Sequence, residues 1–375
     1  MPSLPIVHWT ESGQACSAYW RSESGAAPPA RIDIADDRMP ASVAYRHVCA
    51  GTHLLWRGDF HNARQLLQAL ARRIDQKPRK PAANALDAFN RHRMAQAQRA
   101  RLLGSLLLPF EADHGIALRR APDARQACMQ AYGPAPGPYL ASLRELQGVI
   151  GAHEWRKKGV PIAALQARIH PHYGVFSPVR GEYIDLVARA PLPAGVPSLA
   201  FDIGTGTGVL AAVLARRGVP RVVATDQDPR ALACARENLE RLGLQPNVAL
   251  QQADLFPEGK ATLIVCNPPW LPARPGAPVE YAIYDPESRM LAGFLQGLTA
   301  HLEAGGEGWL IMSDLAEHLG LRQPGELADR FAQAGLRVVG RLDARPSHPR
   351  AADASDPLHA ARSAEVTSLW RLAAA

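Results

Sequence analysis

Short apolar runs alternate with amphipathic helical stretches along the second half of this 375-residue chain, and this alternation limits the possible folds more than any other feature. Strand–helix alternation of this length predicts a parallel sheet with helices on both faces. We expect two further apolar runs, 336–342 and 366–372, to pair antiparallel at one sheet edge, with no convincing helix between them. The other expected elements are strands at 198–203, 221–225, 248–251, 262–266 and 307–312 and helices at 207–217, 229–242 and 287–302.

The first half of the chain has a different pattern. Apolar residues recur at helical spacing over 59–74, 83–108 and 139–158. The stretch 22–30 is rich in Ser, Gly, Ala and Pro, which is typical of a loose arm. We therefore predict a mainly helical N-terminal domain over residues 1–165 and a second, α/β domain over residues 166–375.

Charge is spread unevenly between the two halves. Residues 1–170 carry 23 Lys and Arg against 13 Asp and Glu, a net charge of +10, whereas residues 171–375 carry 19 against 22, a net charge of −3. A basic half favours an anionic partner such as RNA or a ribosomal surface. Arginine-rich helices with solvated faces give the same composition, so both interpretations remain open.

Composition and cysteine usage exclude several classes of protein. Hydrophobic residues make up 47% of the chain and charged residues 21%, which is an ordinary globular balance. The strongly apolar run 102–110 is about half the ~20 residues that span a bilayer, and the N-terminus lacks the features of a signal peptide. The five cysteines are odd in number and widely spaced, which disfavours a disulfide or zinc framework. We expect a cytoplasmic protein with no membrane segment and no bound metal; the sequence does not indicate an oligomeric state.

A glycine-rich turn follows the first expected strand of the second domain, with the sequence Phe201-Asp202-Ile203-Gly204-Thr205-Gly206-Thr207-Gly208. Glycines at this place let the backbone approach a ligand closely. Asp226 ends the next strand, 22 residues after Gly204, where a carboxylate can accept hydrogen bonds from both hydroxyls of a ribose. Asp226 could instead cap a helix, but Asp228 is the better candidate for that role. Dinucleotide-binding folds share such a turn, so NAD and S-adenosylmethionine are both possible at this point.

The segments after the third and fourth strands separate these possibilities. Asp254-Leu255-Phe256 follows the third strand, where the carboxylate can accept from an adenine amino group and Leu255 or Phe256 can pack on the ring. Asn267-Pro268-Pro269-Trp270 follows the fourth strand, and a dehydrogenase has no use for that tetrapeptide. We therefore predict S-adenosylmethionine as the cofactor. The predicted cofactor-binding residues are Asp202, Gly204, Thr205, Gly206, Gly208, Asp226, Gln227, Asp254, Leu255, Phe256 and Asn267.

The tetrapeptide suits methyl transfer to a planar nitrogen, and we predict that all four of its residues form the catalytic site. Such a nitrogen is a poor nucleophile because its lone pair is delocalised. The Asn267 side-chain oxygen and the Pro268 carbonyl can each accept one N–H bond, which pulls the nitrogen towards sp³ character and aims its lone pair. Pro268 and Pro269 fix the turn and have no N–H to compete for these acceptors. Trp270 offers a flat face for stacking an amide or a base. A rigid turn at the end of a buried strand is the alternative explanation of the tetrapeptide.

Taken together, these motifs resemble a class I methyltransferase of the small group, most like the protein-glutamine methyltransferases of the HemK/PrmC type. The resemblance covers roughly residues 170–315. It implies a Rossmann-like fold with a mostly parallel seven-stranded sheet, cofactor binding by Gly204, Gly206, Asp226 and Asp254, and a target amine held by Asn267, Pro268 and Trp270. The motifs that carry it are Val175-Phe176-Ser177-Pro178, the turn at 202–208, Thr225-Asp226, Asp254-Leu255-Phe256 and Asn267-Pro268-Pro269-Trp270.

The resemblance is specific for the reaction and leaves the substrate open, because RNA guanine, RNA adenine and DNA amino methyltransferases share the Asn-Pro-Pro-aromatic motif. Our first hypothesis is a nitrogen methyltransferase acting on a macromolecule, foremost a protein glutamine. The basic N-terminal domain would recognise the substrate, for which a ribosome-associated molecule is one candidate. An rRNA or tRNA base is the alternative acceptor. A non-catalytic RNA or protein adaptor of the same fold is a third hypothesis, which the intact Asn267-Pro268-Pro269 disfavours. Asp314 and Glu317 follow the fifth strand, and we favour helix capping for them over a place in the pocket.

Overall fold

The computed structural model describes residues 4–76, 80–193, 195–276, 278–346 and 353–375. The chain divides into two compact units. Unit 1 consists of residues 1–82, 90–154 and 276–278, and unit 2 of residues 83–89, 155–275 and 279–375. The main division thus falls at residue 154. Two short segments are exceptions, since 83–89 belongs to unit 2 and 276–278 to unit 1.

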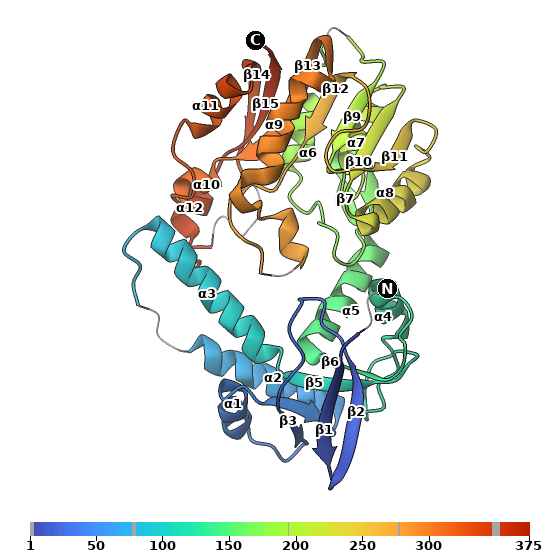
Figure 1. The fold of residues 1–375 in the computed structure, drawn as a ribbon, viewed down its shortest axis with the longest axis vertical. Coiled ribbons are helices and arrows are strands. Elements are labelled where there is room, and N and C mark those ends of the chain that lie inside the picture. Colours follow the sequence, from blue (N-terminus) through green and yellow to red (C-terminus); the bar gives the residue numbers. More distant parts are fainter. Residues whose placement is uncertain (1–3, 77–79, 194, 277, 347–352) are drawn as a thin grey trace. The chain divides into compact units, whose positions relative to one another are not determined.

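Unit 1 contains a six-stranded mixed sheet in the order β1-β2-β6-β5-β4-β3 (Figure 1). Strands β3, β4 and β5 are parallel, whereas β1–β2 and β5–β6 are antiparallel pairs. The strands are β1 (Ile6–Glu11), β2 (Gln14–Trp20), β3 (Ile32–Ala35), β4 (His53–Trp56), β5 (Leu106–Phe110) and β6 (Tyr139–Ser142). The accompanying helices are α1 (Ala41–Cys49), α2 (Phe60–Asp75), α3 (Ala85–Leu103), α4 (Arg125–Tyr132) and α5 (Leu143–Lys158), of which α3 and α5 extend into unit 2.

The expectation of a mainly helical N-terminal domain is wrong, because this unit is built on a sheet. Its strands β3, β4 and β6 have only four residues, too few to display a period of two. β5 follows α3 after only two residues and β6 directly precedes α5, so the sequence pattern merged each strand into its helix. Strands β1 and β2 form a hairpin, whose two turn residues Ser12 and Gly13 both have positive φ, as a type I′ turn requires.

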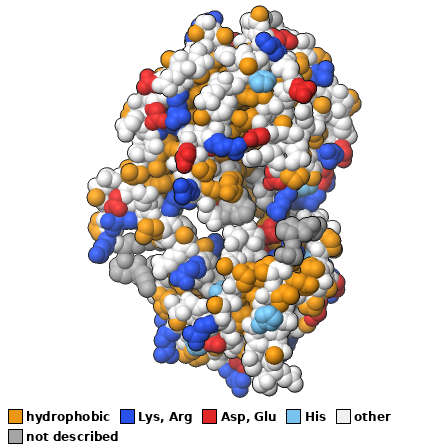
Figure 2. Space-filling view, in the orientation of Figure 1, with side chains coloured by type: hydrophobic (Ala, Val, Ile, Leu, Met, Phe, Trp, Pro, Cys, Tyr) orange, Lys and Arg blue, Asp and Glu red, His pale blue; other side chains and the backbone are white. Residues whose placement is uncertain are grey.

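Basic side chains of unit 1 are spread over the visible face (Figure 2) and are not gathered in one patch. On the face shown in Figure 2, Lys and Arg are scattered among neutral and apolar surface. Several are paired with acids inside the unit: Arg57 contacts Glu11, Arg99 contacts Asp75, and Arg120 contacts the buried Asp59. Part of the positive charge therefore serves internal ion pairs rather than a free surface.

Unit 2 contains a seven-stranded sheet in the order β11-β10-β9-β12-β13-β15-β14, which confirms the expected mostly parallel seven-stranded sheet (Figure 1). The first five strands of this order are parallel, and β15 is antiparallel to both of its neighbours. The strands are β9 (Ala200–Ile203), β10 (Val222–Asp226), β11 (Val248–Gln252), β12 (Ala261–Cys266), β13 (Leu302–Ser313), β14 (Leu336–Ala344) and β15 (Thr367–Ala374). A small antiparallel pair, β7 (Val160–Ile162) and β8 (Ala167–Ile169), precedes this sheet.

Side chains of successive strand residues enter two different cores, one on each face of this sheet. On β12, Leu263 and Val265 belong to the core that includes α6 and α7, whereas Ile264 and Cys266 belong to the core that includes α9 and α11. A strand buried on both faces reads as a continuous apolar run, which explains the sequence pattern. The helices of unit 2 are α6 (Glu182–Arg189), α7 (Val209–Arg216), α8 (Pro229–Leu242), α9 (Arg289–His301), α10 (Leu315–His318), α11 (Glu326–Gln333) and α12 (His359–Ala364).

The expected elements of this unit agree with the structure to within a few residues, and the antiparallel edge pair is confirmed as β14 and β15. One expectation is wrong, since the six-residue helix α12 lies between these two strands along the chain. None of the described helices is long and apolar enough to cross a membrane. Within the described residues there is also no group of three or more His, Cys, Asp or Glu that could hold a metal ion.

Candidate functional site

The strand register brings the predicted site residues to one level of the sheet. Ile203, the last residue of β9, pairs with Thr225 of β10 on one side and with Cys266 of β12 on the other. The next residue of each strand is therefore Gly204, Asp226 and Asn267, respectively. Ligands of open α/β sheets bind at such carboxyl ends. The three sequence motifs thus share one edge of the sheet.

The turn after β9 depends on glycine. Gly204, Gly206 and Gly208 have φ of +71°, +56° and +80°, a region that other residues rarely adopt. A Cβ on Gly204 would lie 2.6 Å from the Cε atom of Met290, whereas nothing lies within 4 Å of a Cβ on Gly206. The turn therefore presents bare backbone with open space beside Gly206, as close approach of a ligand requires.

Asp202 supports this turn from inside the protein. Its Oδ2 atom accepts hydrogen bonds from the Thr205 hydroxyl at 2.6 Å and from the Ala211 N–H at 3.0 Å. The side chain is buried, and burial raises the pKa of the carboxyl to about 6. Both Asp202 and Thr205 are thus part of the internal structure of the turn.

Asp226 joins the turn to the second strand and keeps acceptor capacity. Its Oδ2 accepts from the Gly206 N–H at 3.0 Å and its Oδ1 from the Asp228 N–H at 2.9 Å. Each carboxylate oxygen has a second lone pair that can accept a hydroxyl. The side chain is half-buried, and burial raises its pKa. Neighbouring Gln227 is exposed, and its carbonyl accepts from Gln252.

The segment after β11 has partners that the sequence did not indicate. Asp254 is exposed and forms an ion pair with Arg289 at 2.6 Å. The ring of Phe256 stacks on His301, with 4.2 Å between centroids. Leu255 has a φ of +78°, and its carbonyl accepts from the Thr225 hydroxyl.

Leu255 and Phe256 also pack on a glycine face of α9. A Cβ on Gly293 would lie 2.6 Å from Leu255 Cδ1, and one on Gly297 would lie 2.6 Å from Phe256 Cε2. Both side chains are half-buried against this helix. The two glycines were the available sequence signal for these contacts, since glycine in a helix often permits close packing.

In the tetrapeptide after β12, the Trp270 side chain is bonded to the Asn267 side chain. The indole Nε1–H donates to Asn267 Oδ1 at 2.9 Å. Pro268 is buried, whereas Asn267, Pro269 and Trp270 are half-buried. The sequence analysis assigned Trp270 a stacking face; the structure adds that its N–H fixes the direction of the Asn267 amide. An amide oxygen has two lone pairs, so one acceptor site of Oδ1 remains.

Two arginines that the sequence analysis missed surround Trp270. The guanidinium of Arg180 lies over the indole ring at 5.4 Å and pairs with Glu182 and with the buried Glu365. The buried Arg322 reaches the Trp270 carbonyl at 3.5 Å through Nη2. Arg180 follows the Val175-Phe176-Ser177-Pro178 motif by two residues, which was the one signal in the sequence; Arg322 had none.

Comparison with known proteins finds a family that part of the chain matches. Residues 166–334 match the model of the family described as methyltransferase small domain. The chain is 33% identical over 157 residues to the release factor glutamine methyltransferase of Cereibacter sphaeroides, an alignment that covers 38% of this chain and 54% of that protein. It is 46% identical over 70 residues to the ribosomal protein L11 methyltransferase of Symbiobacterium thermophilum, covering 19% of this chain and 23% of that protein.

The chain thus spans about half, or less, of the length of these curated relatives. Among solved structures, a methyltransferase from Pyrococcus furiosus aligns with a TM-score of 0.40 and 19% identity, covering 61% of this chain and 98% of that chain. The resemblance to the HemK/PrmC type, which the sequence motifs indicated, is confirmed by the family match and the alignment with a glutamine methyltransferase. Residues 166–334 are therefore similar to a methyltransferase small domain, and the strand order of unit 2 is that of a Rossmann-like α/β fold.

Proposed function

We propose that this protein is a nitrogen methyltransferase whose acceptor is a planar amide or amino nitrogen of a macromolecule, foremost a protein glutamine. The observation that carries the proposal is the register of β9 and β12. Because Cys266 pairs with Ile203, the Asn267 acceptor leaves the sheet beside the glycine turn. A methyl donor held at the turn and a nitrogen held at Asn267 would then be neighbours.

The cofactor side of the site fits S-adenosylmethionine. Open space beside Gly206 leaves room for the ligand at the bare backbone, and the second lone pairs of the Asp226 carboxylate can accept ribose hydroxyls. We propose that Gly204, Gly206 and Asp226 hold the cofactor, with Asp254 and Gln227 at its edge. When bound, it supplies a methyl group already activated by a sulfonium.

The acceptor side supplies orientation and polarisation. We propose that Asn267 Oδ1 and the Pro268 carbonyl each accept one N–H of the target nitrogen, which weakens the delocalisation of its lone pair. Trp270 Nε1 holds the Asn267 amide in the orientation that this needs. Because the nucleophile is neutral, these residues need only position the nitrogen and accept its hydrogens, with no strong base.

Two observations bear on the nature of the macromolecule. The relatives named release factor glutamine methyltransferase and ribosomal protein L11 methyltransferase act, by their names, on proteins, which favours a protein acceptor. We propose that the basic unit 1 contacts the substrate, because residues 1–170 carry a net charge of +10. The same charge favours the second candidate, methylation of an rRNA or tRNA base.

Methyl-labelled S-adenosylmethionine and a total cell extract test this proposal. The extract is incubated with the purified chain, and protein and RNA are then separated and counted. We expect the label in protein, lowered by about 10²- to 10³-fold with the Asn267→Ala variant. Label confined to RNA would support the base methyltransferase, and label in neither fraction would leave a non-catalytic adaptor as the explanation.

A further inference from the structure

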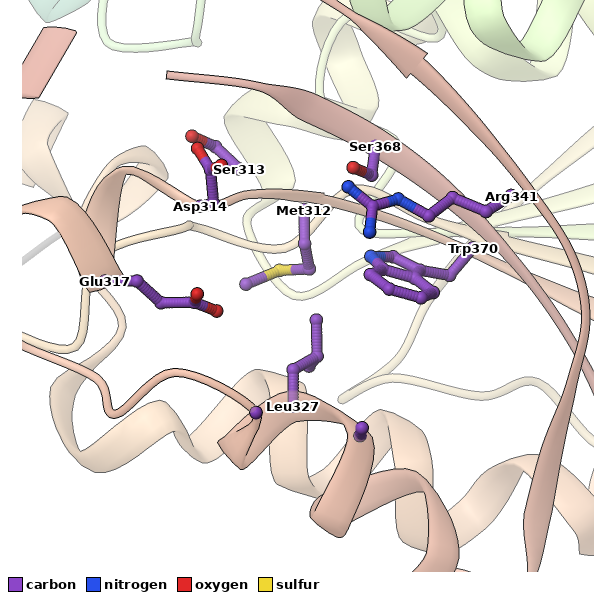
Figure 3. A pocket seen from close by; sticks show the side chains of 10 residues that line it. Met312, Ser313, Asp314, Glu317, Leu327, Arg341, Ser368 and Trp370 are labelled. Atoms are coloured by element: carbon purple, nitrogen blue, oxygen red, sulfur yellow. The ribbon is translucent and has the colours of Figure 1, made fainter. Parts of the chain in front are cut away.

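A cavity of about 280 Å³ lies in unit 2 among β13, β14, β15 and the α10–α11 segment. Figure 3 shows its side chains: Glu317 and Asp314 on one side, the Arg341–Trp370 pair on the other, and Met312 and Leu327 between them. The sequence analysis favoured helix capping for Asp314 and Glu317. Asp314 does occupy the cap position of α10, but its side chain makes no capping hydrogen bond, and both acids line the cavity.

The acidic side of this cavity lacks a full counter-charge. The Glu317 carboxylate forms no hydrogen bond or ion pair with any described residue. Burial and the nearby Asp314 raise the pKa of its carboxyl. Asp314 accepts from the Val366 N–H at 2.7 Å and lies 3.3 Å from His318 Nε2. Arg322, His318 and Arg341 attract this carboxylate, but none of them lies within ion-pair distance of it. Each unpaired carboxylate in a partly buried place favours an incoming cation.

The basic side of the cavity is already neutralised. Arg341 donates from Nε to Asp343 Oδ1 at 2.6 Å, and its guanidinium lies 4.4 Å from the centre of the Trp370 ring. Asp343 also accepts from the Ser368 hydroxyl at 2.7 Å. Arg341 is therefore held by its own partners, and the free charge in the cavity is negative.

The residues that line the cavity favour an organic cation carried on an aliphatic chain. Two carboxylates with no third ligand are too few for a metal site, and no group of three metal-ligating side chains occurs among the described residues. Met312, Leu327 and Trp370 offer apolar walls for a hydrocarbon stem, as lysine and arginine side chains require. The phosphates of RNA would be repelled by the same carboxylates.

The cavity is connected to the acceptor site through one segment. Ala316 and Leu319 pack in one cluster with Leu271, the residue that follows Trp270. Arg322, which closes this segment, contacts the Trp270 carbonyl. We propose that the cavity is a subsite for a lysine or arginine side chain of the polypeptide that carries the target nitrogen. This rests on the proposed function and selects protein over RNA as the acceptor.

Nuclear magnetic resonance of the full chain measures occupancy of this cavity without methyl transfer. The reporter is the indole N–H of Trp370, assigned with a Trp370→Phe variant. The probes are Nα-acetyl-lysine amide, Nα-acetyl-norleucine amide, which has the stem without the charge, and uridine monophosphate. We expect saturable shifts with the lysine probe alone. Equal shifts with the norleucine probe, shifts with the nucleotide, or no shift with lysine would each overturn the proposal.

Two variants assign the binding to the carboxylate. Glu317→Gln keeps the shape and removes the charge, and should weaken binding of the lysine probe about tenfold, since a charge-assisted hydrogen bond is lost. Glu240→Gln makes the same change at an exposed position of α8 and should leave binding as it is. Binding that is unaffected by Glu317→Gln would contradict the subsite.

The outcome for the cavity and the outcome for the enzyme are separable. If the labelled methyl group enters RNA while the lysine probe still binds, the protein acceptor is wrong and the cation site stands. If the label enters protein and the lysine probe fails to bind, the enzyme proposal stands and the subsite is wrong.

Discussion

The two sides of the candidate site are held in different ways. On the cofactor side, Asp226 is fixed by backbone N–H groups of Gly206 and Asp228. On the acceptor side, Asn267 is fixed by the side chain of Trp270. Backbone partners are set by the course of the chain, whereas side-chain partners depend on rotamers and on several segments. The difference predicts a rigid cofactor side and an acceptor side that a single substitution can loosen.

The largest expected effect on methyl transfer comes from removing the Asn267 acceptor itself. Asn267→Ala should lower methyl transfer by about 10²- to 10³-fold, because one of two preorganised acceptors is lost. Cofactor affinity should stay within about twofold, since the glycine turn and Asp226 are untouched. Single-turnover transfer and calorimetry of S-adenosylmethionine binding measure the two effects. Loss of cofactor binding, or retained transfer, would show that the assigned role is wrong.

The pH dependence of the unfolding free energy tests how Asp202 is held in the cofactor side. Burial raises the pKa of its carboxyl to about 6, against about 3.9 in an unfolded chain. The folded protein therefore keeps this proton to higher pH, so the group's contribution to stability is present below about pH 4 and is lost as the pH rises to about 6.

Asp202→Asn does not titrate and should remove that dependence. Relative to the native chain, the variant should gain up to about 3 kcal/mol of unfolding free energy between pH 4 and pH 6.5, because two pKa units correspond to roughly that amount. Denaturant unfolding at several pH values measures the difference. A difference that stays constant with pH would mean that the carboxyl is not protonated in the fold.

Asp226→Ala should produce the reverse of the Asn267 result. Removing an acceptor of two ribose hydroxyls should weaken cofactor binding by about 30-fold, while the transfer rate at saturating cofactor stays near that of the native chain. Calorimetry and steady-state kinetics measure the two quantities. If the rate at saturation falls as far as the affinity, the two sides are not independent.

Trp270→Phe has the smallest expected effect on methyl transfer, and it tests how Asn267 is held on the acceptor side. Phenylalanine keeps a flat ring and loses the N–H that holds Asn267, so transfer should fall about fivefold with unchanged cofactor affinity. Trp155→Phe, at an exposed tryptophan, is the matched control and should have no effect. Equal rates in the two variants would show that the hydrogen bond does not position Asn267.

The sequence placed the three motifs on one edge of the sheet but missed the arginines around Trp270, for a physical reason. Periodicity located β9, β10 and β12, and parallel topology brings their carboxyl ends together, so Gly204, Asp226 and Asn267 could be placed without coordinates. Arg180 and Arg322 lie in loops far from Trp270 in the chain, and no local sequence pattern indicates such contacts.

The sheet of unit 1 was missed because its short strands give only a weak pattern in the local sequence. Strands as short as β5 and β6, which lie within two residues of a helix, show no clear period of two. The hairpin of β1 and β2 was detectable from Ser12-Gly13, a turn dipeptide between two runs of strand-forming residues. Long-range pairing of β2 with β6 was not.

The chemical position of the transferred methyl group tests the account most directly. The purified chain is supplied with methyl-labelled S-adenosylmethionine and cell extract, and the labelled product is digested and sequenced by mass spectrometry. The account predicts the label on an amide or exocyclic amino nitrogen, and methylamine on acid hydrolysis of an amide product. A label on a carboxylate oxygen, a thiol or a carbon would contradict it, because two N–H acceptors have no role in those transfers.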